Sequence, residues 1–233
     1  MRGQGPGMSL GSSLDRPASR HEPLRIGLTG NIGAGKSSVA KLLADHGAAV
    51  VDADALARAA TEDPAVLKAI AAELGPDLVI TAGDGEPRLD RAATAARVFD
   101  DDRALARLNA LIHPWVRRRS AELVAELERS ERPPPVIVFD IPLLYENDLH
   151  RGLDAVVVVD APLSERVARV VARSGLEPAA VRRRDAAQLP LEQKVARADF
   201  VVDNTGDEIA LVGQVALLWR DLLGLRGEAS VQR

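Results

Sequence analysis

The chain has 233 residues, of which 30 are Lys or Arg and 34 are Asp or Glu, so its formal net charge is −4 at pH 7. This charge provides no general attraction for nucleic acid or an anionic membrane, and an aromatic content of 3% leaves few rings to stack on bases. The absence of cysteine excludes disulfide bonds and thiolate metal sites. The composition predicts a globular core of aliphatic side chains whose anion sites are local.

The N-terminal residues 1–23 are rich in Gly, Ser and Pro and have no apolar periodicity, which predicts a flexible extension or a mis-assigned start with Met8 as a second candidate. No apolar run reaches the length of a membrane span, and the N-terminus lacks the apolar core of a signal peptide. The sequence therefore predicts a cytoplasmic protein that binds neither membrane nor nucleic acid and has no evident obligate protein partner.

Short aliphatic runs alternate with helical patterns from Leu24 onward. Five runs are predicted to be strands: Leu24–Thr29, Ala48–Asp52, Val136–Asp140, Ala155–Asp160 and Phe200–Asp203. Strands that are apolar without alternation are covered on both faces, and parallel strands need helical crossovers. We predict an α/β fold in which helices wrap a parallel five-stranded sheet.

The helices predicted between and after these strands are Ser37–Asp45, Trp115–Glu131, Leu163–Arg173 and Glu208–Leu223. The interval of about 55–132 is mostly helical in pattern and predicts a helical insertion after the second strand. Residues of about 163–197 form a second helical segment, and residues 225–233 are predicted to be a tail.

The run Gly30-Asn31-Ile32-Gly33-Ala34-Gly35-Lys36-Ser37 satisfies G-x-x-x-x-G-K-[ST] and lies between a predicted strand and a predicted helix. Its glycines would let the amides of Gly33 to Ser38 point at a phosphate, aided by the helix N-terminus. Lys36 would reach the β and γ phosphates and the Ser37 hydroxyl would hold Mg²⁺. The alternative, a Gly-rich turn with a solvated Lys, does not account for the strand and helix that flank the motif.

Carboxylates follow two of the predicted strands. Asp52 and Asp54 would face the same way in extended backbone, one toward Mg²⁺ and the other toward an acceptor hydroxyl. Equally, Asp54 could only cap a helix that begins at Ala55. Asp140 ends the third strand and could hold Mg²⁺, although many strands end in Asp because of turn chemistry.

The segment 163–197 has eight basic and four acidic residues in a chain whose net charge is negative. Arg166, Arg169 and Arg173 are spaced to share one helix face, and this pattern would suit a lid over phosphates. A solvated helix face explains the same pattern. His113 precedes Pro114, and we interpret it as a residue at a helix boundary, where capping or packing is the more ordinary role.

These motifs together resemble the dephospho-CoA kinase family over about residues 24–224. The resemblance is carried by five segments in order: Ile26-Gly27-Leu28-Thr29-Gly30 with the phosphate loop, Val51-Asp52-Ala53-Asp54, Leu108-Asn109-Ala110-Leu111-Ile112-His113-Pro114, Ile141-Pro142-Leu143-Leu144-Tyr145-Glu146, and Ala198-Asp199-Phe200-Val201-Val202-Asp203-Asn204.

The resemblance implies a phosphate-loop kinase core, an inserted substrate-binding domain, a lid, and transfer of the γ-phosphoryl of ATP to the ribose 3′-hydroxyl of dephospho-CoA. Its implied roles are as follows: catalysis by Asp54, Lys36, Arg169 and Arg173; ATP binding by Gly33, Ala34, Gly35, Lys36, Ser37, Ser38 and Arg184; and acceptor binding by Asp54, His113, Pro142, Leu143 and Leu144. The candidates for Mg²⁺ binding, Ser37, Asp52 and Asp140, come from the residue pattern itself, and the family is not uniformly acidic at the position of Asp140. Asn31 stands where the family loop commonly has Gly, which asks Asn to occupy a tight turn.

Two other functions fit parts of the sequence. Another phosphate-loop kinase of a small metabolite or nucleoside would carry the same loop. A nucleotide-dependent switch is disfavoured because the chain has no N-K-x-D motif to read guanine.

Overall fold

The computed structural model describes residues 22–83, 85–99 and 101–228. Most of the predicted extension 1–23 and the last five residues lie outside this range. No helix within it is long and apolar enough to cross a bilayer. The predicted cytoplasmic location stays a prediction.

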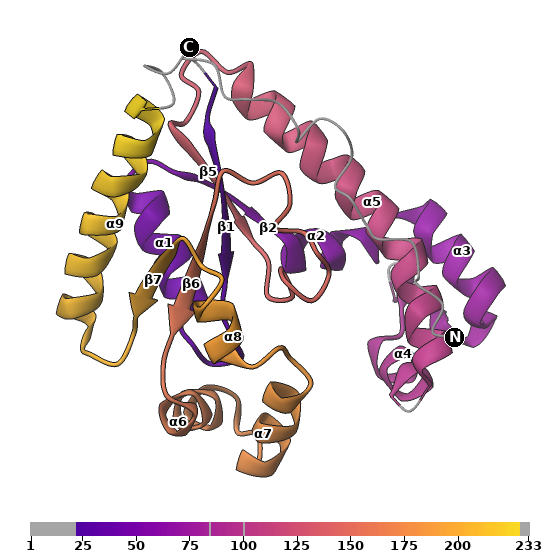
Figure 1. Cartoon of the computed structure of the whole chain (residues 1–233). Coiled ribbons are helices and arrows are strands. Elements are labelled where there is room, and N and C mark those ends of the chain that lie inside the picture. Colours follow the sequence, from indigo (N-terminus) through magenta and orange to yellow (C-terminus); the bar gives the residue numbers. More distant parts are fainter. Residues whose placement is uncertain (1–21, 84, 100, 229–233) are drawn as a thin grey trace, which may run out of the picture. The chain divides into compact units, whose positions relative to one another are not determined.

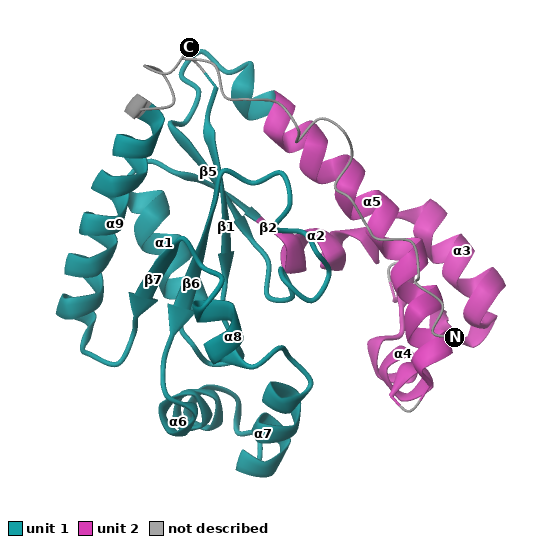
Figure 2. Cartoon of the chain, in the orientation of Figure 1, with its two compact units in different colours: residues 1–51, 126–233 teal, residues 52–125 magenta. Residues whose placement is uncertain are grey.

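The chain divides into two compact units, residues 1–51 with 126–233, and residues 52–125 (Figure 2). The first unit is an α/β layer structure and the second is mainly helical. The division into extension, kinase domain, insertion, lid and tail remains a prediction.

The first unit is built on a five-stranded sheet with the order β2-β5-β1-β6-β7 (Figure 1). Its strands are β1 (Leu24–Thr29), β2 (Ala49–Asp52), β5 (Val136–Asp140), β6 (Ala155–Asp160) and β7 (Phe200–Asp203). β1 pairs in parallel with β5 and β6, and β6 with β7. The predicted α/β fold is therefore confirmed, and all five strand predictions hold to within one residue.

Helices α1 (Lys36–Asp45) and α9 (Glu208–Glu228) contact each other and cover one face of the sheet (Figure 1). Val39, Leu43, Val215 and Leu222 from these helices are fully buried with the strand side chains that point to this face. Burying an aliphatic side chain is worth about 1.5–3 kcal/mol, so this layer holds the sheet against its helices. α9 continues five residues beyond the predicted end at Leu223 and includes the start of the predicted tail.

The opposite face is covered in part by the loop that follows β5. A Cβ atom on Gly27 would lie 2.8 Å from side-chain atoms of Leu144 and Leu153. β1 and this loop therefore pack more closely than a side chain at residue 27 would allow.

Helices α6 (Leu163–Ser174), α7 (Pro178–Ala186) and α8 (Leu191–Val195) lie between β6 and β7 in the chain. α6 ends at Gly175, whose φ of 66° is the left-handed conformation that glycine adopts at helix ends. α7 packs on α6, and α8 packs on β6 (Figure 1).

The second unit contains four helices, a short 3₁₀ turn and a two-stranded sheet among its described residues. They are α2 (Ala53–Ala60), α3 (Pro64–Leu74), η1 (Pro76–Leu78), β3 (Val79–Thr81), β4 (Pro87–Leu89), α4 (Arg91–Val98) and α5 (Asp102–Glu128), which runs on into the first unit. β3 and β4 pair antiparallel, and the core is formed by aliphatic side chains such as Ile70, Leu78 and Leu108.

The predicted start of the long helix at Trp115 is wrong, because α5 begins at Asp102 and contains Pro114. Proline inside a helix removes one N–H donor, and sequence rules therefore place a boundary there. Ala104, Leu108 and Ile112 precede Pro114 and are buried in the core of this unit. Their burial keeps the helix continuous across the proline.

Candidate active site

The Gly-rich loop joins β1 to α1 at the carboxyl edge of the sheet, where open α/β sheets bind their ligands. Gly33 and Gly35 adopt φ values of 79° and 97°, which only glycine adopts without strain. A Cβ atom would lie 2.4 Å from the Arg166 carbonyl oxygen at Gly33, and 2.0 Å from Asn204 Nδ2 at Gly35. Both glycines are required by close packing as well as by backbone conformation.

Two of the six amides predicted to face a phosphate already donate within the loop. The Ala34 amide donates to the Asn31 carbonyl oxygen and the Ser38 amide to that of Gly35, both at 3.0 Å. The first amides of any helix have no acceptor inside the helix, so those at the start of α1 remain suited to an anion.

Asn31 begins a tight turn, as expected, because its carbonyl oxygen accepts from the Ala34 amide at 3.0 Å. It does so without a left-handed conformation, since the only non-glycine residue with positive φ in the described ranges is Asp148. The Asn31 side chain is also engaged, donating through Nδ2 to Asp185 Oδ1 at 3.0 Å and to the Leu189 carbonyl oxygen at 3.2 Å.

Lys36 at the start of α1 forms an ion pair with Asp140 at the end of β5. Both side chains are largely buried, with 16% and 8% of their surfaces exposed. Adjacent parallel strands β1 and β5 bring the two residues to the same sheet edge. The structure thus joins two residues that the sequence assigned separately to phosphate and to metal.

Ser37 is exposed in the first turn of α1, one residue after the lysine that pairs with Asp140. A hydroxyl and a carboxylate are hard oxygen donors, which suit Mg²⁺ when phosphate oxygens and water complete the shell. Within the described residues no group of three or more His, Cys, Asp or Glu could hold a metal by itself. These donors fit a metal that is bound together with a nucleotide.

The loop after β5 is fixed by buried polar contacts. The Pro142 carbonyl oxygen accepts hydrogen bonds from Thr29 Oγ1 at 3.0 Å and Lys194 Nζ at 3.2 Å. Lys194 is completely buried and pairs with Glu146 at 2.8 Å. Of the side chains predicted to bind the acceptor here, Leu143 is exposed and Leu144 is buried.

Arg166 does not belong to an exposed cationic stripe with Arg169 and Arg173. Only 4% of it is exposed, and it forms an ion pair with Asp185. Its guanidinium also donates to the Ala161 carbonyl oxygen at 2.9 Å and to that of Ile32 at 3.4 Å. Arg166 is a packing residue between α6, α7 and the phosphate loop.

The other predicted arginines differ in their surroundings. Arg169 donates to Glu165 Oε2 at 2.9 Å and to the Asn204 carbonyl oxygen at 2.6 Å. Arg173 and Arg184 are exposed, and neither side chain makes a hydrogen bond or ion pair with another residue that the structure describes. These two guanidinium groups are therefore available to a ligand.

The backbone from Asp52 to Asp54 is not extended, contrary to the sequence prediction, because α2 begins at Ala53. β2 ends at Asp52, whose Oδ1 caps α2 by accepting from the Ala55 amide at 2.9 Å. Asp54 lies in the first turn of α2, is exposed, and has no ion pair or side-chain hydrogen bond with the described residues. The capping alternative thus applies to Asp52, and Asp54 is free for other chemistry.

His113 is not at a helix boundary, since it lies in the interior of α5. Burial, and to a lesser extent the nearby Arg117, lower the pKa of His113 below its ordinary value of 6.5. The imidazole is therefore neutral at pH 7 and can donate or accept a hydrogen bond.

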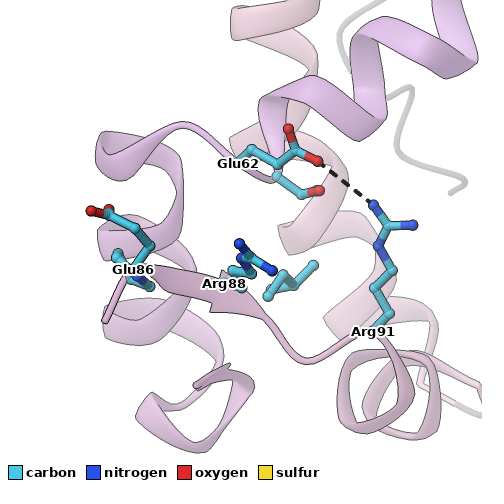
Figure 3. Close-up of a pocket in the computed structure, with 7 residues that line it drawn as sticks. Glu62, Glu86, Arg88 and Arg91 are labelled. Atoms are coloured by element: carbon cyan, nitrogen blue, oxygen red, sulfur yellow. Dashed lines mark ion pairs between the residues drawn. The ribbon is translucent and has the colours of Figure 1, made fainter. Parts of the chain in front are cut away.

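A cavity of about 590 Å³ lies within the second unit, on the side of β4 (Figure 3). Arg88 and Arg91 bring two guanidinium groups to it, and Arg91 lies 4.0 Å from Glu62. Its full lining is Thr61, Glu62, Glu86, Pro87, Arg88, Leu89 and Arg91.

Sequence reasoning missed the supports of the phosphate loop. Asn204 Nδ2 donates to the Ala34 carbonyl oxygen at 2.7 Å, and Gln188 Oε1 accepts from the Ile32 amide at 2.8 Å. The signal for Asn204 was a polar residue directly after a predicted strand that ends at the same sheet edge as β1. Gln188 follows α7 and carried no comparable signal.

A buried parallel strand, a glycine loop and a lysine at the start of the next helix define a phosphate-loop nucleotide-binding protein. Residues 24–209 match the family model described as dephospho-CoA kinase. The chain belongs to the dephospho-CoA kinase family.

Individual relatives agree with this assignment. A dephospho-CoA kinase from Deinococcus radiodurans is 50% identical, covering 88% of this chain and 96% of the relative. One from Thermobifida fusca is 48% identical, covering 85% and 96%. A crystal structure of a Thermus thermophilus protein superposes with a TM-score of 0.73 at 42% identity, covering 86% of this chain and 97% of the other.

Proposed function

We propose that this chain phosphorylates the ribose 3′-hydroxyl of dephospho-CoA with ATP, giving coenzyme A and ADP, the final step of coenzyme A synthesis. The observation that carries the proposal is the phosphate loop between β1 and α1 in a chain whose residues 24–209 match the dephospho-CoA kinase family.

ATP binds at the phosphate loop, with residues Gly33 to Ser38 around its phosphates and Lys36 placed to contact them. Asp140 supports this role because it holds the Lys36 ammonium at the end of the loop. Ser37 and Asp140 would hold Mg²⁺, which neutralises phosphate charge when bound. Asp52 is a weaker candidate ligand, because its Oδ1 already caps α2.

Asp54 acts as the base for the acceptor. The 3′-oxygen forms a bond to the γ-phosphorus while the bond from that phosphorus to the β,γ-bridging oxygen breaks, and ADP leaves with that oxygen. The hydroxyl proton passes to the Asp54 carboxylate and then to solvent. The exposed carboxylate of Asp54, without a partner among the described residues, supports this assignment.

Arg169, Arg173 and Arg184 supply positive charge for the transferred group and the ATP phosphates. Phosphoryl transfer depends on such neutralisation because charge is spread over the phosphoryl oxygens. The free guanidinium groups of Arg173 and Arg184 support the proposal more directly than Arg169, which is held by Glu165 and Asn204.

The acceptor contacts His113 and the loop of Pro142, Leu143 and Leu144. Neutral His113 and exposed Leu143 fit such contacts. Leu144 would contribute by fixing the backbone of the loop, because its own side chain is buried.

The test is a panel of acceptors incubated with Mg-ATP and followed by mass spectrometry. Dephospho-CoA should gain one phosphate, located at the ribose 3′ position by fragmentation, whereas adenosine, pantetheine and gluconate should remain unchanged. Phosphorylation of one of these other acceptors would favour the alternative small-molecule kinase.

A further inference from the structure

The phosphate loop is anchored at its second residue by a side chain rather than by backbone alone. Asn31 is 3% exposed, and its Nδ2 reaches both Asp185 Oδ1 and the Leu189 carbonyl oxygen. Its Oδ1 is buried without a hydrogen-bond partner among the described residues. The side-chain amide of Asn31 is therefore held only through Nδ2, by Asp185 near the end of α7 and by Leu189 before α8.

Asp185 lies on α7 and connects the Asn31 side chain to α6. Its Oδ1 also accepts from the Arg166 guanidinium, which is buried between α6 and the loop. Arg166 donates in turn to the Ile32 carbonyl oxygen, while the Ile32 amide donates to Gln188. Consecutive residues of the phosphate loop are thus bonded to α6 and to the end of α7.

The bonds that hold Asn31 and Ile32 also restrict the backbone at Gly33. The backbone carbonyl of Arg166 lies so close to Gly33 that no Cβ would fit there. A shift of Asn31 and Ile32 would therefore change the path of the loop at Gly33, where the predicted ATP cradle begins.

We propose that Asn31 is a positioning residue for ATP: its amide, through Asp185, holds the phosphate loop in the conformation that binds the nucleotide. The proposal rests on the nucleotide-binding role of the loop proposed above. Asn31 touches neither phosphate nor acceptor in this role, and acts by limiting the conformations of the loop before ATP binds.

The affinity for a non-hydrolysable ATP analogue with Mg²⁺, measured by calorimetry, tests the role of Asn31 without any acceptor. Asn31→Ala should weaken binding about 3- to 10-fold, the range of one net hydrogen bond. Asn31→Asp should weaken it more, about 10- to 100-fold at pH 8, since two carboxylates would then face each other. Gln193→Ala is the matched control, because Gln193 is exposed on α8 and makes no bond to the loop.

The decisive comparison adds Asp185→Asn to the Asn31→Asp variant. The new amide at 185 can accept from Arg166 and donate to the carboxylate at 31, so affinity should recover at least 5-fold. A residue that served only general stability would show no such recovery. Thermal unfolding of each variant confirms that binding is measured on folded protein. If Asn31→Asp does not fold, the affinity of Asn31→Ala is the test.

Unchanged affinity in Asn31→Ala, or no recovery in Asn31→Asp/Asp185→Asn, would overturn the proposal. Wild-type protein that binds no ATP analogue would overturn the nucleotide role of the loop as well. Normal wild-type binding with insensitive variants would overturn only the role of Asn31.

Discussion

The Asn204 side-chain amide donates a 2.7 Å hydrogen bond to the Ala34 carbonyl oxygen, so the residue after β7 supports the middle of the phosphate loop. This contact leaves no space for a side chain at Gly35. Gly35→Ala should therefore displace Asn204 or the loop and weaken ATP binding about 10- to 100-fold, corresponding to an overpacking cost of about 1–3 kcal/mol.

Gly213→Ala is its control. A Cβ atom at Gly213 meets no atom within 4 Å, and the residue lies inside α9. Alanine should raise the free energy of unfolding by about 0.5–1 kcal/mol with unchanged ATP binding. Wild-type ATP affinity in Gly35→Ala would refute the packing explanation.

Asp54→Asn should lower kcat about 10²- to 10⁴-fold, because the amide cannot take up the acceptor proton. ATP affinity and melting temperature should stay near wild-type values, since the carboxylate has no bond to lose among the described residues. Steady-state kinetics and calorimetry measure these quantities.

Asp52→Ala should behave differently. It removes the cap of α2 and should cost about 0.5–2 kcal/mol of unfolding free energy. If Asp54→Asn were the less stable variant and kept normal turnover, the base assignment would be wrong.

Lys36→Met should abolish detectable turnover and also destabilise the fold by about 1–3 kcal/mol, because the buried Asp140 loses its cation. The double variant Lys36→Met/Asp140→Asn should regain most of this stability and none of the activity. Chemical denaturation distinguishes the two effects. Equal stability of the single and double variants would show that the Asp140 carboxylate left without Lys36 is not what destabilises the single variant.

Asp185 should make the stability depend on pH in acid. Burial by itself favours its protonated form, but hydrogen bonds from Arg166 and Asn31 outweigh burial and lower the pKa of Asp185 below 3.8. A carboxyl whose pKa is lower in the folded state contributes stability above its unfolded pKa and loses it as pH falls through the folded value.

Melting temperatures of wild type and Asp185→Asn should therefore differ at pH 6. The difference should begin to shrink near pH 4 and disappear only below the lowered pKa of folded Asp185. A constant difference across this range would mean that the charge of Asp185 is not what stabilises the contact.

Much of the first unit could be predicted because its signals are local. Uninterrupted aliphatic runs identified the five strands, and the glycine and lysine spacing identified the phosphate loop. The start of α5 was missed because a proline rule was applied where buried side chains on the preceding turns decide the outcome.

The roles of individual polar residues were harder to predict because they depend on which partner each side chain meets in the folded protein. Asn31 contacts Asp185, and Arg166 is neutralised by the same carboxylate rather than exposed to phosphate. Asp52, not Asp54, caps α2 because the helix begins two residues earlier than expected. No spacing rule brings together Asn31 and Asp185, which are 154 positions apart.

The most direct test of the proposed function is the mass of the product formed from dephospho-CoA and Mg-ATP by the purified protein. We predict stoichiometric formation of ADP and coenzyme A, with the new phosphate on the ribose 3′-oxygen, at a rate of about 1–100 per second. Absence of coenzyme A, or a phosphate at any other position, would contradict the proposed function.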